Sequence, residues 1–534
     1  MFSQLLDKSR FLLAVMLTAA CPSLVAADEP IQKLIERLEA AETRIQELEQ
    51  LENQTAPVPK LAAAEASIFA PAGWTAGDGD QVDPIIQELT SDWKNKWISQ
   101  TSTNDDLEKA IKESVQSGTS GTKSMKVVGR IHADYWGIPD SSPGINLIET
   151  GNPNNTPQDR AGFRRMRFGV RGDVSPNMGY RIEMEFAGGN ASEFRDAFIS
   201  LKEVPWLQKV IVGNHKRPYG LDHLNSSRHN VFLERPFVIE SFNQDCRRLG
   251  VSSNGVSDDQ SWNWRYGVWN QRLIQDEGNY ISDHLQGEIA GRLANTYWYD
   301  KQCGGENYAH WAISATFAHP DGSTDGDPAD FGETESQNEA RFRHRPEART
   351  DQRWLDTGRI AGADWYEMIG VEKVVNFGPL QIVGEYQNLF MQRDPGFRDL
   401  HIHGGYVYAS YFLTGEYMPW NRKSGTLDRV KPHKNFFMVD RHCSGTDTGW
   451  GAWQIAVRYS YADFNDQDGV AGITNQDVYG GLGESVTLGL NWLWNPNTRL
   501  QLNYIAGNIR DRDIDGALVG GNYDIFGARF MIDF

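Results

Sequence analysis

Three arginines, Arg165, Arg167 and Arg171, lie close together in the stretch GFRRMRFGVRGD, residues 162–173. In an extended strand alternate residues share one face, so these guanidinium groups point the same way and Phe168 points the other way. Guanidinium groups stay charged at any relevant pH and present planar donors to phosphate or carboxylate oxygens. The stretch spans roughly 20 Å from Arg165 to Arg171, which is enough for successive contacts to a moving anion.

Basic residues recur on the polar face of later alternating stretches. The candidate anion-contacting residues are Arg165, Arg167, Arg171, Lys216, Arg217, Arg248, Arg292, Arg458 and Arg529. The alternative is structural, because arginines inside a protein commonly pair with acids. Pairing of about half of these arginines is expected on this ground, with acids such as Glu183, Glu185, Glu372 and Glu385.

Other chemistry finds little support in the sequence. His401 and His403 in HIHGG have no carboxylate spaced to complete a metal site, so we interpret them as a pair of surface loop histidines. Glu385 and Glu416 have no identifiable partner for general acid catalysis. We therefore expect no enzymatic activity, no metal site and no cofactor.

Period-two alternation defines the elements that must position these residues. From Lys126 to the C-terminus apolar and polar residues alternate without long helical patterns. The final stretch, YDIFGARFMIDF, places alternate apolar residues on one face and ends on Phe534. Chain ends usually fray into water, so an apolar, aromatic end is typical of the terminal strand of a bacterial outer-membrane barrel. In such a barrel the apolar face meets lipid and the polar face lines a water-filled lumen.

Composition restricts the class of protein. The 534 residues carry a formal net charge of −19, which argues against nucleic-acid binding. After the leader no stretch is apolar enough for a membrane-spanning helix, whereas barrel strands are only half apolar.

The N-terminal region divides into three parts. Residues 1–27 resemble a secretory signal peptide, with Lys8 and Arg10 ahead of the apolar segment FLLAVMLTAA and small residues before Asp28. Residues 28–52 follow the heptad spacing of a short coiled coil. Residues 53–123 form a linker region, and residues 124–534 carry the strand pattern.

Cysteines are few and form no metal-binding motif. Removal of the leader leaves Cys246, Cys303 and Cys443, a set too small and odd-numbered for a disulfide scaffold. A disulfide between Cys303 and Cys443 is nevertheless predicted, because the expected topology puts both on the periplasmic side.

Short and long connections alternate along the barrel region. Counting them gives about sixteen strands, an even number that leaves both chain ends in the periplasm. Three long connections are locally basic: the third outer loop (217–245), the fifth outer loop (321–362) and one periplasmic connection (417–450).

The strand region resembles the family of phosphate-selective porins O and P. Five stretches carry the resemblance and spread over nearly all of residues 126–534: VIVGNHKRPYGLDHLNSSRHNVFLERP, GRIAGADWYEMIGVEKVVNFGPLQIVGEYQ, YVYASYFLTGE, GAWQIAVRYS and TLGLNWLWNPNTRLQLNYI. The resemblance implies an all-β fold, a homotrimer of sixteen-stranded transmembrane antiparallel barrels in outer-membrane lipid. It also implies that loops and one periplasmic turn fold into the lumen, where small anions such as phosphate diffuse passively.

Two readings of the function stay open. The first is a porin that prefers anions, with its N-terminal segment in the periplasm. The alternative is a structural envelope protein, in which the coiled coil reaches the cell wall and the barrel serves as its anchor in the outer membrane.

Overall fold

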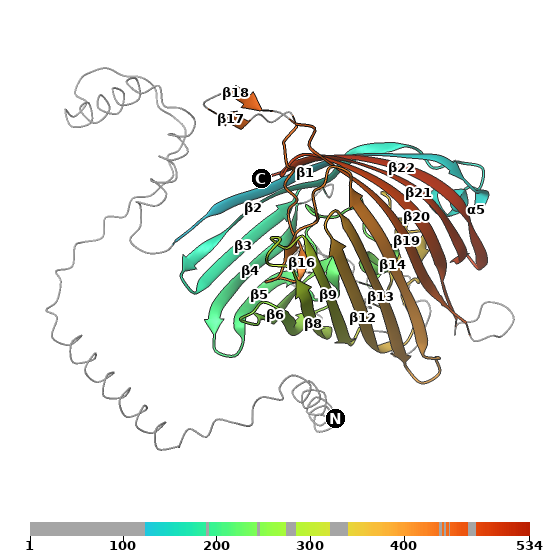
Figure 1. Ribbon diagram of the computed structural model, residues 1–534. Helices are drawn as coiled ribbons and strands as arrows, with labels where there is room; N and C mark the ends of the chain where they lie inside the picture. Colours follow the sequence, from blue (N-terminus) through green and yellow to red (C-terminus); the bar gives the residue numbers. More distant parts are fainter. Residues whose placement is uncertain are drawn as a thin grey trace, which may run out of the picture. The chain divides into compact units, whose positions relative to one another are not determined.

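Sixteen antiparallel strands close into one barrel (Figure 1). The computed structural model describes residues 123–187, 192–242, 246–273, 285–320, 340–436, 440–442, 445–447, 449–467 and 477–534. The expected signal peptide and coiled coil lie outside the described residues, as does the linker apart from its last residue. The predictions made for them therefore stay predictions.

The barrel strands follow one another in sequence order around the wall. They are β1 (Lys126–Ser141), β2 (Arg160–Ser175), β3 (Met178–Glu185), β4 (Glu193–Val204), β5 (Gln208–Lys216), β6 (Arg247–Val256), β7 (Trp262–Asn270), β8 (Gly287–Tyr299), β9 (Asn307–Ala318), β12 (Ala363–Phe377), β13 (Leu380–Arg393), β14 (Leu400–Phe412), β19 (Ala452–Asp466), β20 (Val478–Asn495), β21 (Thr498–Ile514) and β22 (Ala517–Asp533). The predicted fold class and strand number are confirmed.

The wall closes where the first strand meets the last. β1 pairs with β2 on one side and with β22 on the other, and Arg130 lies opposite Asp533 in the second pair. The terminal Phe534 extends this seam, because its backbone N–H donates to the Gly129 carbonyl at 3.2 Å. The apolar C-terminal stretch is thus the strand that closes the barrel.

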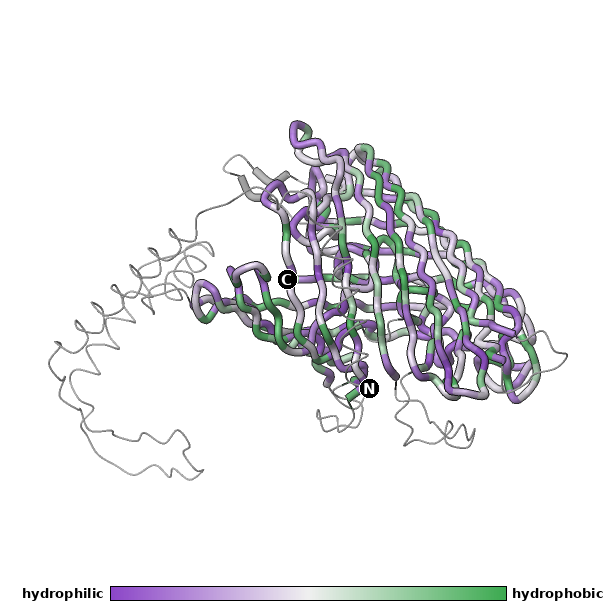
Figure 2. The backbone as a smooth tube through the Cα atoms, turned by 90° about the horizontal axis from the view of Figure 1, so that it is seen from below, coloured by the Kyte–Doolittle hydropathy of each residue, from purple (hydrophilic) through white to green (hydrophobic). Residues whose placement is uncertain are grey.

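Side chains alternate across the wall as the period-two pattern predicts. Phe168, Val457 and Leu488 project outward and are 51%, 45% and 53% exposed, whereas Arg458 projects inward and is 2% exposed. Figure 2 shows hydrophobic and hydrophilic residues alternating along the strands. One face of each strand can therefore meet acyl chains while the other lines the lumen.

The hydrophobic core lies inside the barrel and combines inward residues of the strands with residues of the loops. Leu233, Phe237 and Trp354 are completely buried although none of them belongs to a barrel strand. The loop elements are α5 (Pro143–Thr150), α6 (Leu221–Leu224), α7 (Phe237–Ser241) and the two-residue strands β10 (Arg343–His344), β11 (Leu355–Asp356), β15 (Trp420–Asn421) and β16 (Thr426–Leu427). Strands β17 (Asp440–His442) and β18 (Gly445–Asp447) form a separate hairpin. None of the helices in the described part of the chain is long and apolar enough to cross a membrane.

Candidate functional site

The third loop folds into the lumen, where its described part (residues 217–242, the third-loop segment) carries α6 and α7. The backbone N–H groups of Leu221 and Asp222 donate to the Glu385 carboxylate on β13 at 2.8 and 2.7 Å. Gly220 permits this approach, because it has a φ of 138° and an added Cβ would lie 2.4 Å from Glu385 Oε2. The segment is therefore tied to the opposite wall.

The fifth loop also enters, through residues 340–362 (the fifth-loop segment). Its strands β10 and β11 form a small sheet, and an ion pair between Arg341 and Asp356 at 2.6 Å spans that sheet. Its Glu347 accepts the backbone N–H of Phe237 at 3.1 Å. This carboxylate joins the fifth-loop segment to the third-loop segment inside the barrel.

The long connection between β14 and β19 enters from the other end, through residues 413–436 (the inward turn). The Trp420 indole donates to Thr296 on β8 at 3.0 Å, and the Tyr308 hydroxyl donates to the Met418 carbonyl at 2.9 Å. The backbone N–H of Leu427 donates to Asn225 of the third-loop segment at 3.0 Å. All three expected inward segments therefore narrow the lumen.

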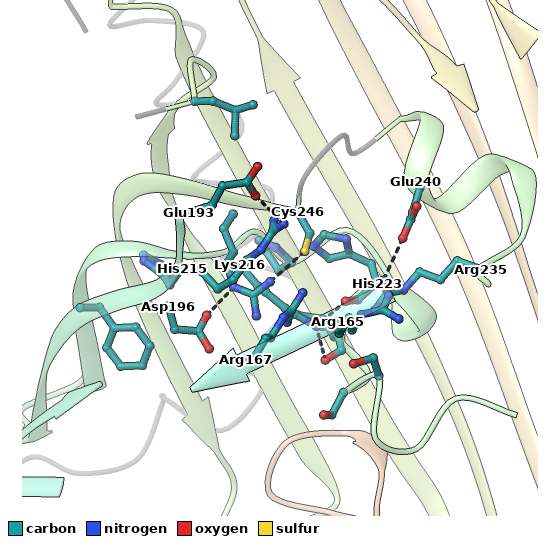
Figure 3. A pocket seen from close by; sticks show the side chains of 18 of the residues that line it. Arg165, Arg167, Glu193, Asp196, His215, Lys216, His223, Arg235, Glu240 and Cys246 are labelled. Atoms are coloured by element: carbon teal, nitrogen blue, oxygen red, sulfur yellow. Dashed lines mark hydrogen bonds and ion pairs between the residues drawn. The ribbon is translucent and has the colours of Figure 1, made fainter. Parts of the chain in front are cut away.

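Between the wall and these segments lies a cavity of about 610 Å³ (Figure 3). Its described lining contains thirteen arginines and two lysines against three acids, Glu193, Asp196 and Glu240. The side chains come from β1 to β7, the third-loop segment and the fifth-loop segment. Positive charge therefore collects at one place in a protein whose overall charge is −19.

Seven of these cations, which we call the cavity cations, have no carboxylate within ion-pair distance among the described residues. They are Arg165, Lys209, Lys216, Arg265, Arg345, Arg349 and Arg353. Arg165 is 3% exposed, and its Nε and Nη1 have no hydrogen-bond partner in the part of the chain that the structure describes. Lys216 donates to the carbonyls of His223, Leu224 and Asn225 at 2.7 to 3.1 Å, so backbone dipoles rather than an ion pair solvate its charge in the described part of the chain.

The fifth-loop segment supplies three cavity cations that disfavour one another's charge. Burial, together with Arg353 and Arg349, lowers the pKa of Arg345 to about 9. Burial and neighbouring arginines lower the pKa of Arg353 to about 10. Burial and Arg164 act in the same direction on the pKa of Arg349. A lowered pKa in a base means that the folded protein disfavours its protonated form, which an anion in the cavity would relieve.

Four of the predicted residues instead form buried ion pairs, and we call them the wall arginines. Arg217 pairs with Glu288 at 2.6 Å, Arg292 with Glu372, Arg458 with Glu347 at 2.7 Å, and Arg529 with Asp134 at 2.6 Å. Three of the partners, Glu288, Glu372 and Asp134, lie on wall strands, whereas Glu347 lies on the fifth-loop segment. The wall arginines therefore join strands to one another and to the loops.

The remaining predicted residues divide differently. Arg165, Arg167 and Lys216 line the cavity, and Arg167 pairs with Glu185 at 2.6 Å. Arg248 lies inside the barrel but donates to the carbonyl of Arg247 at 2.8 Å and to that of Gln271. Arg171 is exposed towards the far end of β2 and does not line the cavity. The series of anion contacts expected along β2 from Arg165 to Arg171 is therefore incomplete.

Two interpretations from the sequence are wrong. Glu385 pairs with no arginine among the described residues; it accepts the two N–H groups of the third-loop segment and the Tyr406 hydroxyl. His401 and His403 lie on β14 rather than in a loop, and their rings stack with centroids 5.0 Å apart. Within the described residues no group of three or more His, Cys, Asp or Glu side chains could hold a metal ion.

Arg164 is a cavity residue that strict alternation misses. A β-bulge on β2 pairs Arg165 with His132 and Phe163 with Ala133, so Arg164 is the extra residue. Its guanidinium turns inward and donates to Glu234 of the third-loop segment at 2.7 and 2.9 Å. The two adjacent arginines, Arg164 and Arg165, were the only feature of the sequence that could have indicated this residue. Lys209, Arg265 and Arg353 were also missed, because nothing local in the sequence distinguishes them.

Comparison with known proteins gives a family match over the barrel. The model of the family described as "Phosphate-selective porin O and P" matches residues 125–534. An uncharacterized protein of Caulobacter vibrioides is 28% identical over 427 residues, covering 78% of this chain and 75% of the relative.

Cys303 carries a free thiol in the structure, and Cys443 lies outside the described residues, so the predicted disulfide stays a prediction.

Solved structures similar to this chain include an outer-membrane protein and an anion-selective porin. OmpT of Vibrio cholerae in its trimer form is 12% identical with a TM-score of 0.45, covering 77% of this chain and 100% of the other. The anion-selective porin of Comamonas acidovorans is 14% identical with a TM-score of 0.42, covering 77% of this chain and 100% of the other.

Proposed function

Because this chain belongs to the family of phosphate-selective porins O and P, it is an outer-membrane porin, and we propose that its pore selects small anions, phosphate among them, at the cavity cations. The observation that carries the proposal is the group of seven cations without a carboxylate partner in the described residues. Cations neutralised by acids would attract neither sign of ion, whereas these keep their field for a passing solute.

The arrangement supports passage by exchange between neighbouring cations. Arg165 presents donors without partners, and the fifth-loop segment adds Arg345, Arg349 and Arg353 around the same cavity. Planar guanidinium groups can hold a tetrahedral oxyanion through several N–H donors at once. Transport would follow the concentration gradient, and no group in this proposal supplies energy.

The wall arginines have a different role in the proposal. Arg217, Arg292, Arg458 and Arg529 each lie at an ion pair with a carboxylate, so their charge is cancelled locally. They hold the constriction in place while the cavity cations set its potential. Of the predicted anion-contacting residues, we assign direct contact to Arg165 and Lys216, because Arg167 pairs with Glu185 at 2.6 Å.

The assembly is also proposed here. The outward residues Phe168 and Val457 are exposed, as contact with membrane lipid requires. We propose a homotrimer in the outer membrane, with residues 28–52 in the periplasm. Migration of unheated, detergent-extracted protein at the mass of three chains supports the trimer, and a monomer that persists at every detergent concentration contradicts it.

Planar bilayers test the selectivity. With a tenfold potassium chloride gradient, the reversal potential should take the sign of chloride permeation, and millimolar phosphate should lower the chloride current by competing for the cavity. The variant Arg165→Gln should weaken the phosphate effect. The matched control is Arg510→Gln, because Arg510 is exposed and pairs with Glu484 outside the cavity. Cation preference in the native protein would overturn the proposal.

A further inference from the structure

A cysteine side chain that forms no disulfide lies in the wall of the cavity. Cys246 immediately precedes β6, and its side chain lines the cavity together with Lys216 and Arg247 (Figure 3). Arg247 Nη1 donates to Cys246 Sγ at 3.2 Å. The sulfur also interacts electrostatically with Lys216 and Arg235. The thiolate is the nucleophilic form of cysteine, and cationic surroundings favour it.

A second observation points to an anion at this place. Arg165 lines the same cavity, is 3% exposed, and has Nε and Nη1 without a partner among the described residues. Buried guanidinium donors are costly when left unpaired. A solute that carries negative charge would satisfy them, and it would arrive close to the thiol.

We propose that Cys246 is a covalent modification site for small anionic disulfides, and that the adduct closes the anion path. The thiolate sulfur of Cys246 attacks one sulfur of the disulfide, so that a new S–S bond forms and the old one breaks. The other half of the disulfide leaves as a thiolate. A dithiol reverses the step by the same exchange. The adduct fills part of the cavity and brings its own negative charge beside Lys216, so both volume and charge oppose further anions. The closure half of the proposal rests on the proposed anion pore, whereas the modification half does not.

Cys303 provides a comparison within the same chain. It lies on the exposed turn between β8 and β9, and its backbone N–H donates to Asp300 at 3.2 Å. A side-chain hydrogen bond with Asp300 and the charges of Asp300 and Glu306 raise the pKa of the Cys303 thiol. There the thiol form is favoured and anions are repelled. The two cysteines should therefore prefer reagents of opposite charge.

The modification is tested with two single-cysteine variants of the chain without its leader, which removes Cys21. The variant C303S/C443S keeps Cys246, and C246S/C443S keeps Cys303. Each is treated with a sulfonatoethyl methanethiosulfonate (anionic) and with a trimethylammonioethyl methanethiosulfonate (cationic), and intact mass follows the rate. The anionic-to-cationic rate ratio should be at least about tenfold higher at Cys246 than at Cys303, and the difference should shrink in 1 M salt. Equal ratios, or no reaction at Cys246 in the folded protein, would overturn the proposal.

Conductance tests the closure separately. The anionic reagent should lower the chloride current of C303S/C443S, dithiothreitol should restore it, and C246S/C443S should lack the response. Charge-selective labelling of Cys246 without a change in current would overturn the closure. A pore that prefers cations, yet is labelled selectively at Cys246, would contradict the proposed function and leave the modification site standing. An anion-selective pore in which Cys246 does not react would support the proposed function and overturn the modification site.

Discussion

The wall arginines and the cavity cations lie in one lumen and differ in a single respect. Arg458 and Arg529 each lie within 2.7 Å of a carboxylate, whereas Arg165 and Arg349 have no carboxylate at ion-pair distance in the described part of the chain. In the first set, the partner carboxylates cancel the charge locally. The second keeps its field. In the proposed function, the absence of a neighbouring acid, rather than residue type alone, therefore defines the anion site.

The largest expected effect comes from breaking a wall pair. Arg458 Nη2 lies 2.7 Å from Glu347, and Ser485 also donates to that carboxylate at 2.9 Å. The variant Arg458→Met leaves Glu347 buried without its cation and should lower the free energy of unfolding by about 3–5 kcal/mol. Urea unfolding of the barrel in lipid vesicles measures the change.

A double variant sharpens this prediction. R458M/E347Q removes both charges and should recover part of the loss, because an uncompensated buried charge is the main cost. The matched variant Arg349→Met removes a cavity cation and should leave unfolding nearly unchanged. A similar loss for Arg349→Met and Arg458→Met would contradict the division into two sets.

The fifth-loop segment should give the largest effect on selectivity. The triple variant R345Q/R349Q/R353Q removes three cavity cations. A unit charge about 4 Å from an ion is worth about 1 kcal/mol in water, which is about a fivefold factor, so the anion-to-cation permeability ratio should fall at least about fivefold. Stability should hold or rise, because the lowered pKa values of Arg345 and Arg353 show that burial and like charge disfavour their protonated forms. Reversal potentials and urea unfolding measure the two effects.

The sequence predicted the strands of the barrel wall better than the contacts between side chains inside the lumen. Alternation placed Phe168 outside and Arg458 inside correctly, because strand geometry is local and repeats every two residues. It could not show that Arg458 meets Glu347, since 111 residues separate them. The same limit explains the error at Glu385, whose partners are backbone N–H groups that no residue pattern reveals. Arg164 was missed because a bulge changes the parity that the prediction assumed.

Glu385 offers a smaller test of how the constriction is held. The variant Gly220→Ala places a Cβ 2.4 Å from Glu385 Oε2 at a φ of 138°, and we expect a loss of about 1–3 kcal/mol in the free energy of unfolding. Gly516→Ala is the control, because Gly516 also has a positive φ of 82° but has no atom within 4 Å of the added Cβ. Equal losses would mean that backbone strain alone, rather than the contact with Glu385, sets the cost at Gly220.

The smallest effect is expected at a paired arginine that is not buried. Arg510 forms an ion pair with Glu484 at 2.5 Å, yet Arg510 is 51% exposed and Glu484 35% exposed. Water and salt screen such a pair, so Arg510→Ala should change the free energy of unfolding by about 0–1 kcal/mol. Urea unfolding of Arg510→Ala and Arg458→Met, measured under the same conditions, separates the contribution of ion pairing from that of burial. If Arg510→Ala costs as much as Arg458→Met, then pairing rather than burial fixes the cost, and the wall arginines would owe their effect to their carboxylates alone. A small loss for Arg510→Ala instead shows that burial inside the lumen, rather than pairing alone, makes an ion pair costly to break.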